Sequence, residues 1–185
     1  MDLLSKHHYN NSTITIYDNF LDEAAIEQIK EVYDFAFTSE QGYDVKQAAG
    51  AGLYKGVDGD VSGRRLSPMD DDLRHMIKDK MVSLLDVKRS QVKVMFHGMG
   101  SQGGMQWHTD ASMYGAATIF LNDGWEPEYG GLFTFPTEEG FDLCYSVLPI
   151  WNRAVIQIGG YPHAVLPSYS HAPLRKSLQV FIHNE

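Results

Sequence analysis

The sequence predicts a mainly β protein with flanking helices, an α+β fold in which helices pack on one face of a sandwich- or barrel-like β core. Two observations lead to this prediction. The first 88 of the 185 residues contain two amphipathic segments with helix start signals. From about residue 91 onward, short alternating apolar and polar runs follow one another, separated by Gly, Pro, Asn and Asp. The length of 185 residues is that of a single domain, with a helical part at about 1–88 and a β core at about 90–185.

Two helices are expected before the β core. Asp22 is a good N-cap for the first, which follows the strand-like run Thr13–Tyr17 and extends to about Phe37. Its apolar face consists of Ile26, Ile29, Val32, Tyr33 and Ala36. Ser67-Pro68, followed by three aspartates, starts the second helix. The apolar stripe of this helix consists of Leu73, Met76, Ile77, Met81 and Leu84.

The segment between the helices, Gln41–Leu66, is rich in glycine and has no clear periodicity. A connection of this length is usually a functional or mobile loop, and a merely disordered insert is the alternative.

Seven strands are predicted from the period-two runs in the second half of the chain. They are Val92–Phe96, Ala116–Leu121, Leu132–Pro136, Cys144–Leu148, Arg153–Ile158, Ala164–Leu166 and Lys176–His183.

Charge and composition exclude several classes of function. The net charge of −9 argues against non-specific binding to nucleic acid, which needs a basic face. A single cysteine, Cys144, rules out an internal disulfide. No basic run followed by an apolar stretch stands at the N-terminus, and no stretch has the roughly 20 apolar residues that span a bilayer. We therefore expect a soluble cytoplasmic protein with neither nucleic acid nor a membrane as its partner.

The first chemical signal is His108-Thr109-Asp110. On a strand, residues i and i+2 point to the same side, so the imidazole and the carboxylate would be presented together. These two donors suit Fe(II). Taken alone the tripeptide is a weak signal, and a histidine hydrogen-bonded to a nearby carboxylate is the alternative interpretation.

The second signal lies downstream, where His163 follows a glycine turn in an apolar setting. Arg175 stands twelve residues later, and Ser177 lies two residues beyond it on the same strand face. A guanidinium beside a hydroxyl can bind a carboxylate through several hydrogen bonds. Two histidines and one carboxylate would leave positions on iron open, which is typical of non-haem Fe(II) oxygenases.

With these residues, the chain resembles the 2-oxoglutarate/Fe(II) oxygenase superfamily, and most closely its prolyl 4-hydroxylase-like branch. The resemblance covers about Val92 to His183, and the opening Asp18-Asn19-Phe20-Leu21 also looks like that of the family. The segments that match are Trp107–Asp110, Phe120–Asn122 with Trp125, Gly130–Phe135, Pro149 with Trp151–Arg153, His163–Pro167 and Arg175–Leu178.

The resemblance implies a double-stranded β-helix (jelly roll) core backed by the N-terminal helices. It also implies a dioxygenase that converts 2-oxoglutarate and O₂ to succinate and CO₂ while hydroxylating a substrate. By the same resemblance, His108, Asp110 and His163 hold Fe(II), with no further catalytic residue, and Arg175 and Ser177 bind 2-oxoglutarate. Ascorbate is a candidate reductant.

Two positions depart from the family pattern, because Phe96 and Phe120 stand where relatives often carry a tyrosine whose hydroxyl contacts the cosubstrate. Tyr114, Thr118 and His97 are the candidates to replace those contacts. The presence of Asp110 favours hydroxylation, since halogenating members have a small residue there.

The substrate stays open at this point. A prolyl residue in a peptide or protein is the leading hypothesis, and a free amino acid or another small metabolite is the alternative. An alkylated base is disfavoured by the charge of −9 and by the lack of a second arginine shortly after Arg175. A jelly-roll module that only binds metal or sugar is the alternative outside enzymes.

Overall fold

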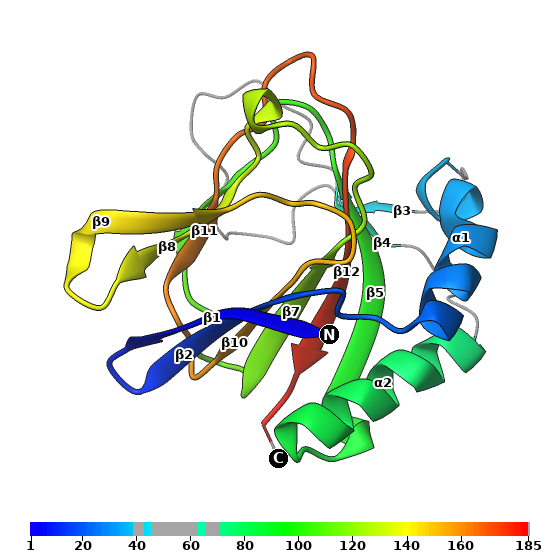
Figure 1. Ribbon diagram of the computed structural model, residues 1–185, viewed down its shortest axis with the longest axis horizontal. Coiled ribbons are helices and arrows are strands. Elements are labelled where there is room, and N and C mark those ends of the chain that lie inside the picture. Colours follow the sequence, from blue (N-terminus) through cyan, green and yellow to red (C-terminus); the bar gives the residue numbers. More distant parts are fainter. Residues whose placement is uncertain (39–42, 46–62, 66–70, 185) are drawn as a thin grey trace.

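The computed structural model describes residues 1–38, 43–45, 63–65 and 71–184 (Figure 1). Most of these residues belong to antiparallel strands. The strands are β1 (Asp2–Tyr9), β2 (Ser12–Asp18), β3 (Tyr43–Val45), β4 (Gly63–Arg65), β5 (Val92–Met99), β6 (Met105–His108), β7 (Gly115–Phe120), β8 (Phe133–Thr137), β9 (Gly140–Val147), β10 (Ala154–Ile158), β11 (His163–Val165) and β12 (Arg175–Ile182). The α-helices are α1 (Glu23–Thr38) and α2 (Asp71–Leu85), and short 3₁₀ turns occupy Arg89–Gln91 and Pro127–Tyr129.

The strands form two main sheets. One has six strands in the order β1-β2-β10-β7-β12-β5, and the other has four in the order β6-β11-β8-β9. Strands that are distant in the sequence are neighbours in both sheets, so the chain crosses repeatedly from one sheet to the other. A separate ladder joins β3 to β4 within the segment that we expected to be a loop. Each of the seven predicted strands corresponds to an observed strand, with ends shifted by up to four residues.

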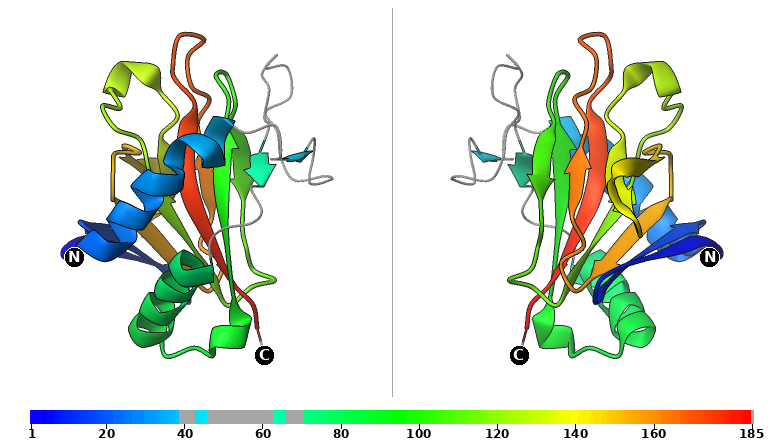
Figure 2. Two further views of the ribbon diagram at one scale, coloured as in Figure 1. Left: turned by 90° about the vertical axis from the view of Figure 1, so that its right-hand side faces the viewer. Right: turned by 90° about the vertical axis from the view of Figure 1, so that its left-hand side faces the viewer.

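Two hydrophobic clusters lie on opposite faces of the six-stranded sheet. One contains Phe133, Phe135 and Val147 of the four-stranded sheet together with Ile14 and Val155 of the larger sheet, so it fills the space between the sheets. The other cluster covers the far face of the larger sheet, and its helix residues include Ala25, Ile29, Leu73, Ile77 and Met81. Figure 2 shows α1 and α2 outside the sheets on that side. The six-stranded sheet therefore separates the core between the two sheets from the core beneath the helices.

Both helices agree with the apolar patterns, as far as they are described. The backbone N–H of Ala25 donates to Asp22 Oδ1 at 3.0 Å, so Asp22 is the predicted N-cap. In α2, Leu73, Ile77 and Met81 are buried as expected. The predicted cap Ser67-Pro68 lies outside the described residues, as do the side chains of Tyr33 and Ala36 and the rest of Gln41–Leu66 apart from β3 and β4.

Of the two strands in the N-terminal hairpin, the sequence predicted only the second. The expected strand at Thr13–Tyr17 is β2, which pairs with β10 near the middle of the chain's β core. β1 was missed because it is an edge strand with mostly exposed residues, so its sequence has no apolar alternation. The helices therefore do not begin the fold, since a β-hairpin of the larger sheet comes first. Across the described residues, we find no helix both long enough and apolar enough to cross a bilayer.

Candidate metal centre

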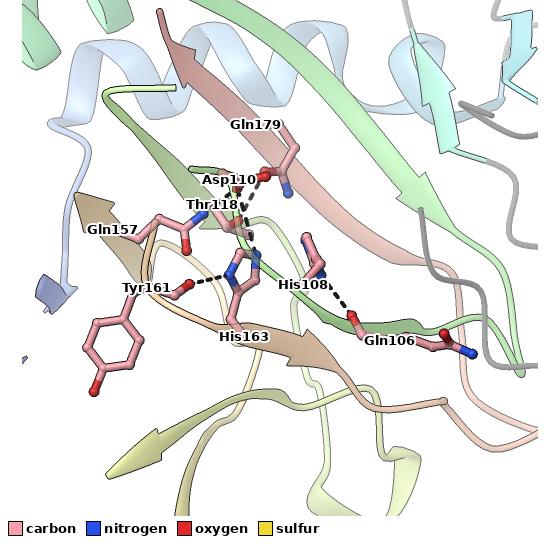
Figure 3. A network of polar contacts seen from close by, with 8 residues as sticks. All are labelled: Gln106, His108, Asp110, Thr118, Gln157, Tyr161, His163 and Gln179. Carbon is pink, nitrogen blue, oxygen red and sulfur yellow. Dashed lines mark hydrogen bonds and ion pairs between the residues drawn. The ribbon is translucent and has the colours of Figure 1, made fainter. Parts of the chain in front are cut away.

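Three potential metal donors meet between the sheets. One ligand atom from each of His108, Asp110 and His163 lies within 4.8 Å of the others (Figure 3). His108 ends β6 and His163 begins β11, and these two residues are direct partners in the antiparallel ladder. Cross-strand partners bring their side chains together, so the two rings are only 4.1 Å apart between centroids. The strand register, and not proximity in sequence, assembles the histidine pair.

Both imidazoles are oriented by backbone carbonyls two residues earlier in the chain. His108 Nδ1 lies 2.7 Å from the carbonyl oxygen of Gln106, and His163 Nδ1 lies 2.9 Å from that of Tyr161. A carbonyl can only accept, so each Nδ1 must carry a proton, and in the neutral ring the lone pair is then on Nε2. This tautomer is the one that binds a metal through Nε2.

Burial keeps His163 in its neutral form. Its pKa falls to about 4, mainly because burial disfavours the charged ring and secondly because His108 stands next to it. The carbonyl of Tyr161 and the carboxylate of Asp110 oppose this shift without cancelling it. Phe133 stacks on the His163 ring at 5.1 Å with an interplanar angle of 13°. At neutral pH the ring is therefore unprotonated, as a metal ligand must be.

Asp110 reaches the site in a different way from the one the sequence suggested. β6 ends at His108, so Asp110 does not share a strand face with it, and the expected alternation was wrong at this residue. Instead, Asp110 opens a turn in which its carbonyl accepts from the backbone N–H of Met113 at 2.8 Å. Its Oδ2 accepts from the side-chain amide of Gln157 and lies 3.8 Å from His163 Nε2. A contact across the interior, not strand geometry, aligns this carboxylate with the histidines.

Gln157 is the polar residue of this site that sequence reasoning missed. It is 4% exposed on β10. The sequence did contain an indication of its role. Gln157 is a polar residue among the apolar residues of Ala154–Ile158, a predicted strand, and a buried amide needs a hydrogen-bond partner.

Arg175 faces the same interior from the start of β12. Its side chain is buried, and its Nε donates to the carbonyl of Gly131 at 2.9 Å. The guanidinium carbon lies 4.9 Å from the centre of the Phe120 ring. The buried Nη2 has no hydrogen-bond partner among the described residues. Burial lowers the pKa of Arg175 to about 10, so the group stays charged at neutral pH. A buried cation with an unused donor is a strong attractor for a carboxylate.

Ser177 and Thr118 belong to one polar network on the interior face. The Ser177 hydroxyl donates to the carbonyl of His97 at 3.3 Å and accepts from the Gln179 amide at 3.1 Å. The Thr118 hydroxyl donates to Gln179 Oε1 at 3.0 Å. Gln179 thus links the two predicted cosubstrate residues, Ser177 and Thr118.

The structure places Tyr114 elsewhere. It precedes β7, at the opposite end of that strand from Phe120, and lines a surface pocket with Asp86, Val87, Gln91 and Asn184. At about 3.3 Å per residue, the length of β7 separates it from Arg175. Tyr114 is therefore distant from Arg175, and its contact with the cosubstrate stays a prediction.

The two phenylalanines that depart from the family pattern lie on different faces. Phe96 packs in the helix-side cluster, so it does not face the interior. Phe120 faces the interior beside Arg175. Only the second of these positions could contribute a contact at this site.

The tryptophans also differ in their surroundings. Trp107 is 40% exposed and lies 5.0 Å from Phe141 between ring centroids. Trp125 is buried and donates through Nε1 to the carbonyl of Gly130 at 3.1 Å. Trp151 packs against the helix-side cluster.

Comparison with known families identifies the class of protein. A model of the 2OG-Fe(II) oxygenase superfamily matches residues 93–183, which include all three donors, Arg175 and Ser177. Over these residues, which make up nearly half of the chain and most of its β core, the protein matches the 2OG-Fe(II) oxygenase superfamily. No curated protein sequence matches it.

Solved structures with the same architecture are distant in sequence. A prolyl-4-hydroxylase from Pseudomonas putida aligns over 93% of this chain and 92% of its own, with 17% identity and a TM-score of 0.64. A prolyl hydroxylase from Trichoplax adhaerens, solved with a peptide of hypoxia inducible factor, aligns over 92% and 83%, with 17% identity and a TM-score of 0.65. HygX from Streptomyces hygroscopicus, solved with nickel, 2-oxoglutarate and hygromycin B, aligns over 92% and 83%, with 10% identity and a TM-score of 0.61. These likenesses show that the mainly β, jelly-roll-like fold is shared.

Proposed function

We propose that this protein is an Fe(II)- and 2-oxoglutarate-dependent dioxygenase that hydroxylates an unactivated C–H bond. The observation that supports this most is the combination of two histidines and one carboxylate with a buried, incompletely paired arginine on the same interior face. The donor set suits Fe(II), since imidazole and carboxylate are both ligands that it accepts.

His108, Asp110 and His163 would hold the iron. Both Nε2 atoms are available because the Nδ1 protons are engaged by carbonyls. The described residues provide only these three donors in the cluster, so positions remain for 2-oxoglutarate and O₂. Bound iron would supply the activation of O₂, which no side chain of the protein can perform.

Arg175 would bind the far carboxylate of 2-oxoglutarate. Its unused Nη2 can donate to a carboxylate oxygen, and burial strengthens that bond by excluding water. Ser177 and Thr118, linked through Gln179, would line the cosubstrate site between this charge and the metal. Phe120 would form its apolar floor beneath the guanidinium.

For the substrate we propose a prolyl residue in a peptide or protein. Two structural relatives are prolyl hydroxylases, and one of these was solved with a peptide. HygX, solved with the small molecule hygromycin B, supports the alternative of a free amino acid or small metabolite. The use of ascorbate as a reductant, a cytoplasmic location and the single domain over 1–185 remain predictions. The absence of a nucleic-acid partner, expected from the charge of −9, is also a prediction.

The reaction class can be tested by succinate formation. Protein loaded anaerobically with Fe(II) is mixed with 2-oxoglutarate, O₂ and pools of peptides or free amino acids, and products are examined for a mass gain of one oxygen. We expect succinate from the wild type and at least about 100-fold less from His108→Ala. Loss of a residue that orients a metal ligand typically costs about 10- to 100-fold in activity, and loss of the ligand itself should cost more.

His75→Ala, on the exposed face of α2, is the matched control and should behave like the wild type. Equal succinate formation by His108→Ala and the wild type would contradict the proposal. Failure of the metal-loaded protein to bind 2-oxoglutarate in calorimetry would favour a non-catalytic binding module instead.

A further inference from the structure

Gln157 makes a directed contact with one oxygen of Asp110. Its side-chain nitrogen donates to Asp110 Oδ2 (Figure 3). A carboxylate oxygen only accepts, so the amide must turn its NH₂ group toward Asp110. The other amide atom, Oε1, is buried and has no hydrogen-bond partner among the described residues. Gln157 therefore leaves one polar atom unpaired while keeping this contact.

The oxygen that Gln157 holds is the one that faces the histidines. Asp110 Oδ2 lies 3.8 Å from His163 Nε2. Asp110 itself lies beyond the end of β6, in a turn, and its side chain is 20% exposed. A carboxylate in such a turn could rotate toward solvent if nothing held it.

The side chain of Gln157 comes from a rigid part of the molecule. In the six-stranded sheet it lies opposite Ile14 on one neighbouring strand and Ala116 on the other. It is 4% exposed, so its position is fixed by packing on both sides. The contact thus ties the Asp110 turn to the middle of the larger sheet.

All three donors then have an orienting partner, but of different kinds. The rings of His108 and His163 are held by carbonyls two residues earlier, which are local contacts. Asp110 is held by a side chain 47 positions later in the chain. Partners of metal ligands fix ligand orientation and tune metal affinity.

We propose that Gln157 is a positioning residue that holds the Asp110 carboxylate beside His163 before the metal binds. This inference rests on the proposed function, because it requires a metal at His108, Asp110 and His163. The protein would bind a divalent metal more tightly with Gln157 than without it, since the third ligand need not be ordered during binding.

The test uses Co(II) in place of the oxygen-sensitive Fe(II). Binding of Co(II) to the full chain is measured by calorimetry, and its visible absorption spectrum reports the ligand geometry. Gln157→Met keeps the side-chain volume and removes the amide donor. We expect about 10- to 100-fold weaker binding and a changed spectrum.

The matched control is Gln91→Met. Gln91 is also partly buried and its amide donates to a carbonyl, that of His183, at 2.8 Å. This control should leave Co(II) affinity within about twofold of the wild type. Thermal midpoints of both variants show whether a general loss of stability accompanies the substitution. Such a loss alone would not alter the spectrum of folded, Co(II)-loaded protein.

If Gln157→Met does not fold, Gln157→Asn replaces it, because it keeps the buried amide and withdraws it by one methylene. Wild-type affinity and an unchanged spectrum in the folded variant would overturn the role of Gln157 and leave the proposed function standing. A wild-type protein that binds no Co(II) would overturn the metal centre and this inference together.

Discussion

Arg175 is a buried, charged residue whose hydrogen-bond donors are only partly paired. Among the described residues its side chain has one hydrogen bond, from Nε to the carbonyl of Gly131. A buried charge is costly unless it is paired and hydrogen-bonded. The free energy lost by burying this guanidinium could be recovered when an anionic ligand pairs with it.

Arg175→Lys should weaken 2-oxoglutarate binding about 10- to 100-fold, because the ammonium keeps the charge and loses the planar pair of donors. The measurement is the KM for 2-oxoglutarate in the succinate assay, together with its Kd in calorimetry. Arg89→Lys, at a surface ion pair with Asp79, is the control. An unchanged KM and Kd for Arg175→Lys would remove Arg175 from the cosubstrate site.

The tautomers of His108 and His163 are set by hydrogen bonds to residues nearby in the chain. Each Nδ1 is satisfied by a carbonyl two residues before it, at 2.7 and 2.9 Å. The local backbone of β6 and of the approach to β11 thus sets the tautomer of each ring. No distant residue is needed to set the tautomer of either ring, whereas the strand register brings the two rings together.

Among the elements, the junction between β2 and α1 is fixed by Asn152, which lies just before β10. Its side-chain oxygen accepts from the backbone N–H of Leu21 at 2.7 Å, and its amide donates to the carbonyl of Leu21 at 3.1 Å. Asn152 is 5% exposed and has a φ of 58°, a left-handed conformation that asparagine tolerates better than most residues. It therefore links the start of α1 to the six-stranded sheet.

Asn152→Ala should lower the free energy of unfolding by about 2–4 kcal/mol, because two buried backbone groups lose their partners and the backbone becomes strained. Urea unfolding measures this loss. Asn152→Gly loses the same hydrogen bonds without the strain, so it should be less destabilising than Asn152→Ala by about 1 kcal/mol. A loss below about 1 kcal/mol for Asn152→Ala would show that the junction does not depend on these bonds.

At the scale of the whole molecule, the candidate metal centre lies where the two sheets approach each other. His108 and His163 belong to the four-stranded sheet, whereas Gln157 belongs to the six-stranded sheet. The chain passes between the sheets through Gly159-Gly160, and a Cβ added to Gly160 would lie 2.8 Å from Ala111 Cα. Gly160 therefore permits the close approach that keeps Asp110, the neighbour of Ala111, in place.

Gly160→Ala should weaken Co(II) binding by about 10-fold or more, because the added methyl group pushes the Asp110 turn away from His163. The measurement is Co(II) calorimetry at a temperature at which the variant is folded. Gly124→Ala is the matched control, since Gly124 also has a positive φ of 67° but an added Cβ there would contact nothing within 4 Å.

Both glycine variants should lose about 1–2 kcal/mol of stability through backbone strain. Equal Co(II) affinities in the two would contradict the role assigned to the close approach at Gly160.

Much of the fold could be predicted because each element carries its own local pattern. Alternation in the run Thr13–Tyr17 records that one face of β2 is buried. The Asp22 cap and the Leu73, Ile77 and Met81 stripe are likewise local features of sequence. β1 has neither pattern, since an exposed edge strand has no face that burial would select.

By itself the sequence determined β2 and seven further strands of the two main sheets, but not β1 or β6, together with the two helices and the chemical identity of the candidate ligands and of Arg175. Each of these follows from residue type and short-range spacing, which fix local hydrogen bonding and burial. Only the tertiary structure decided that Asp110 is aligned by Gln157, that Phe120 but not Phe96 faces the interior, and that Tyr114 lies away from Arg175. These depend on strand register and on contacts between sheets, and the free energy of such contacts comes from residues that are far apart in the chain.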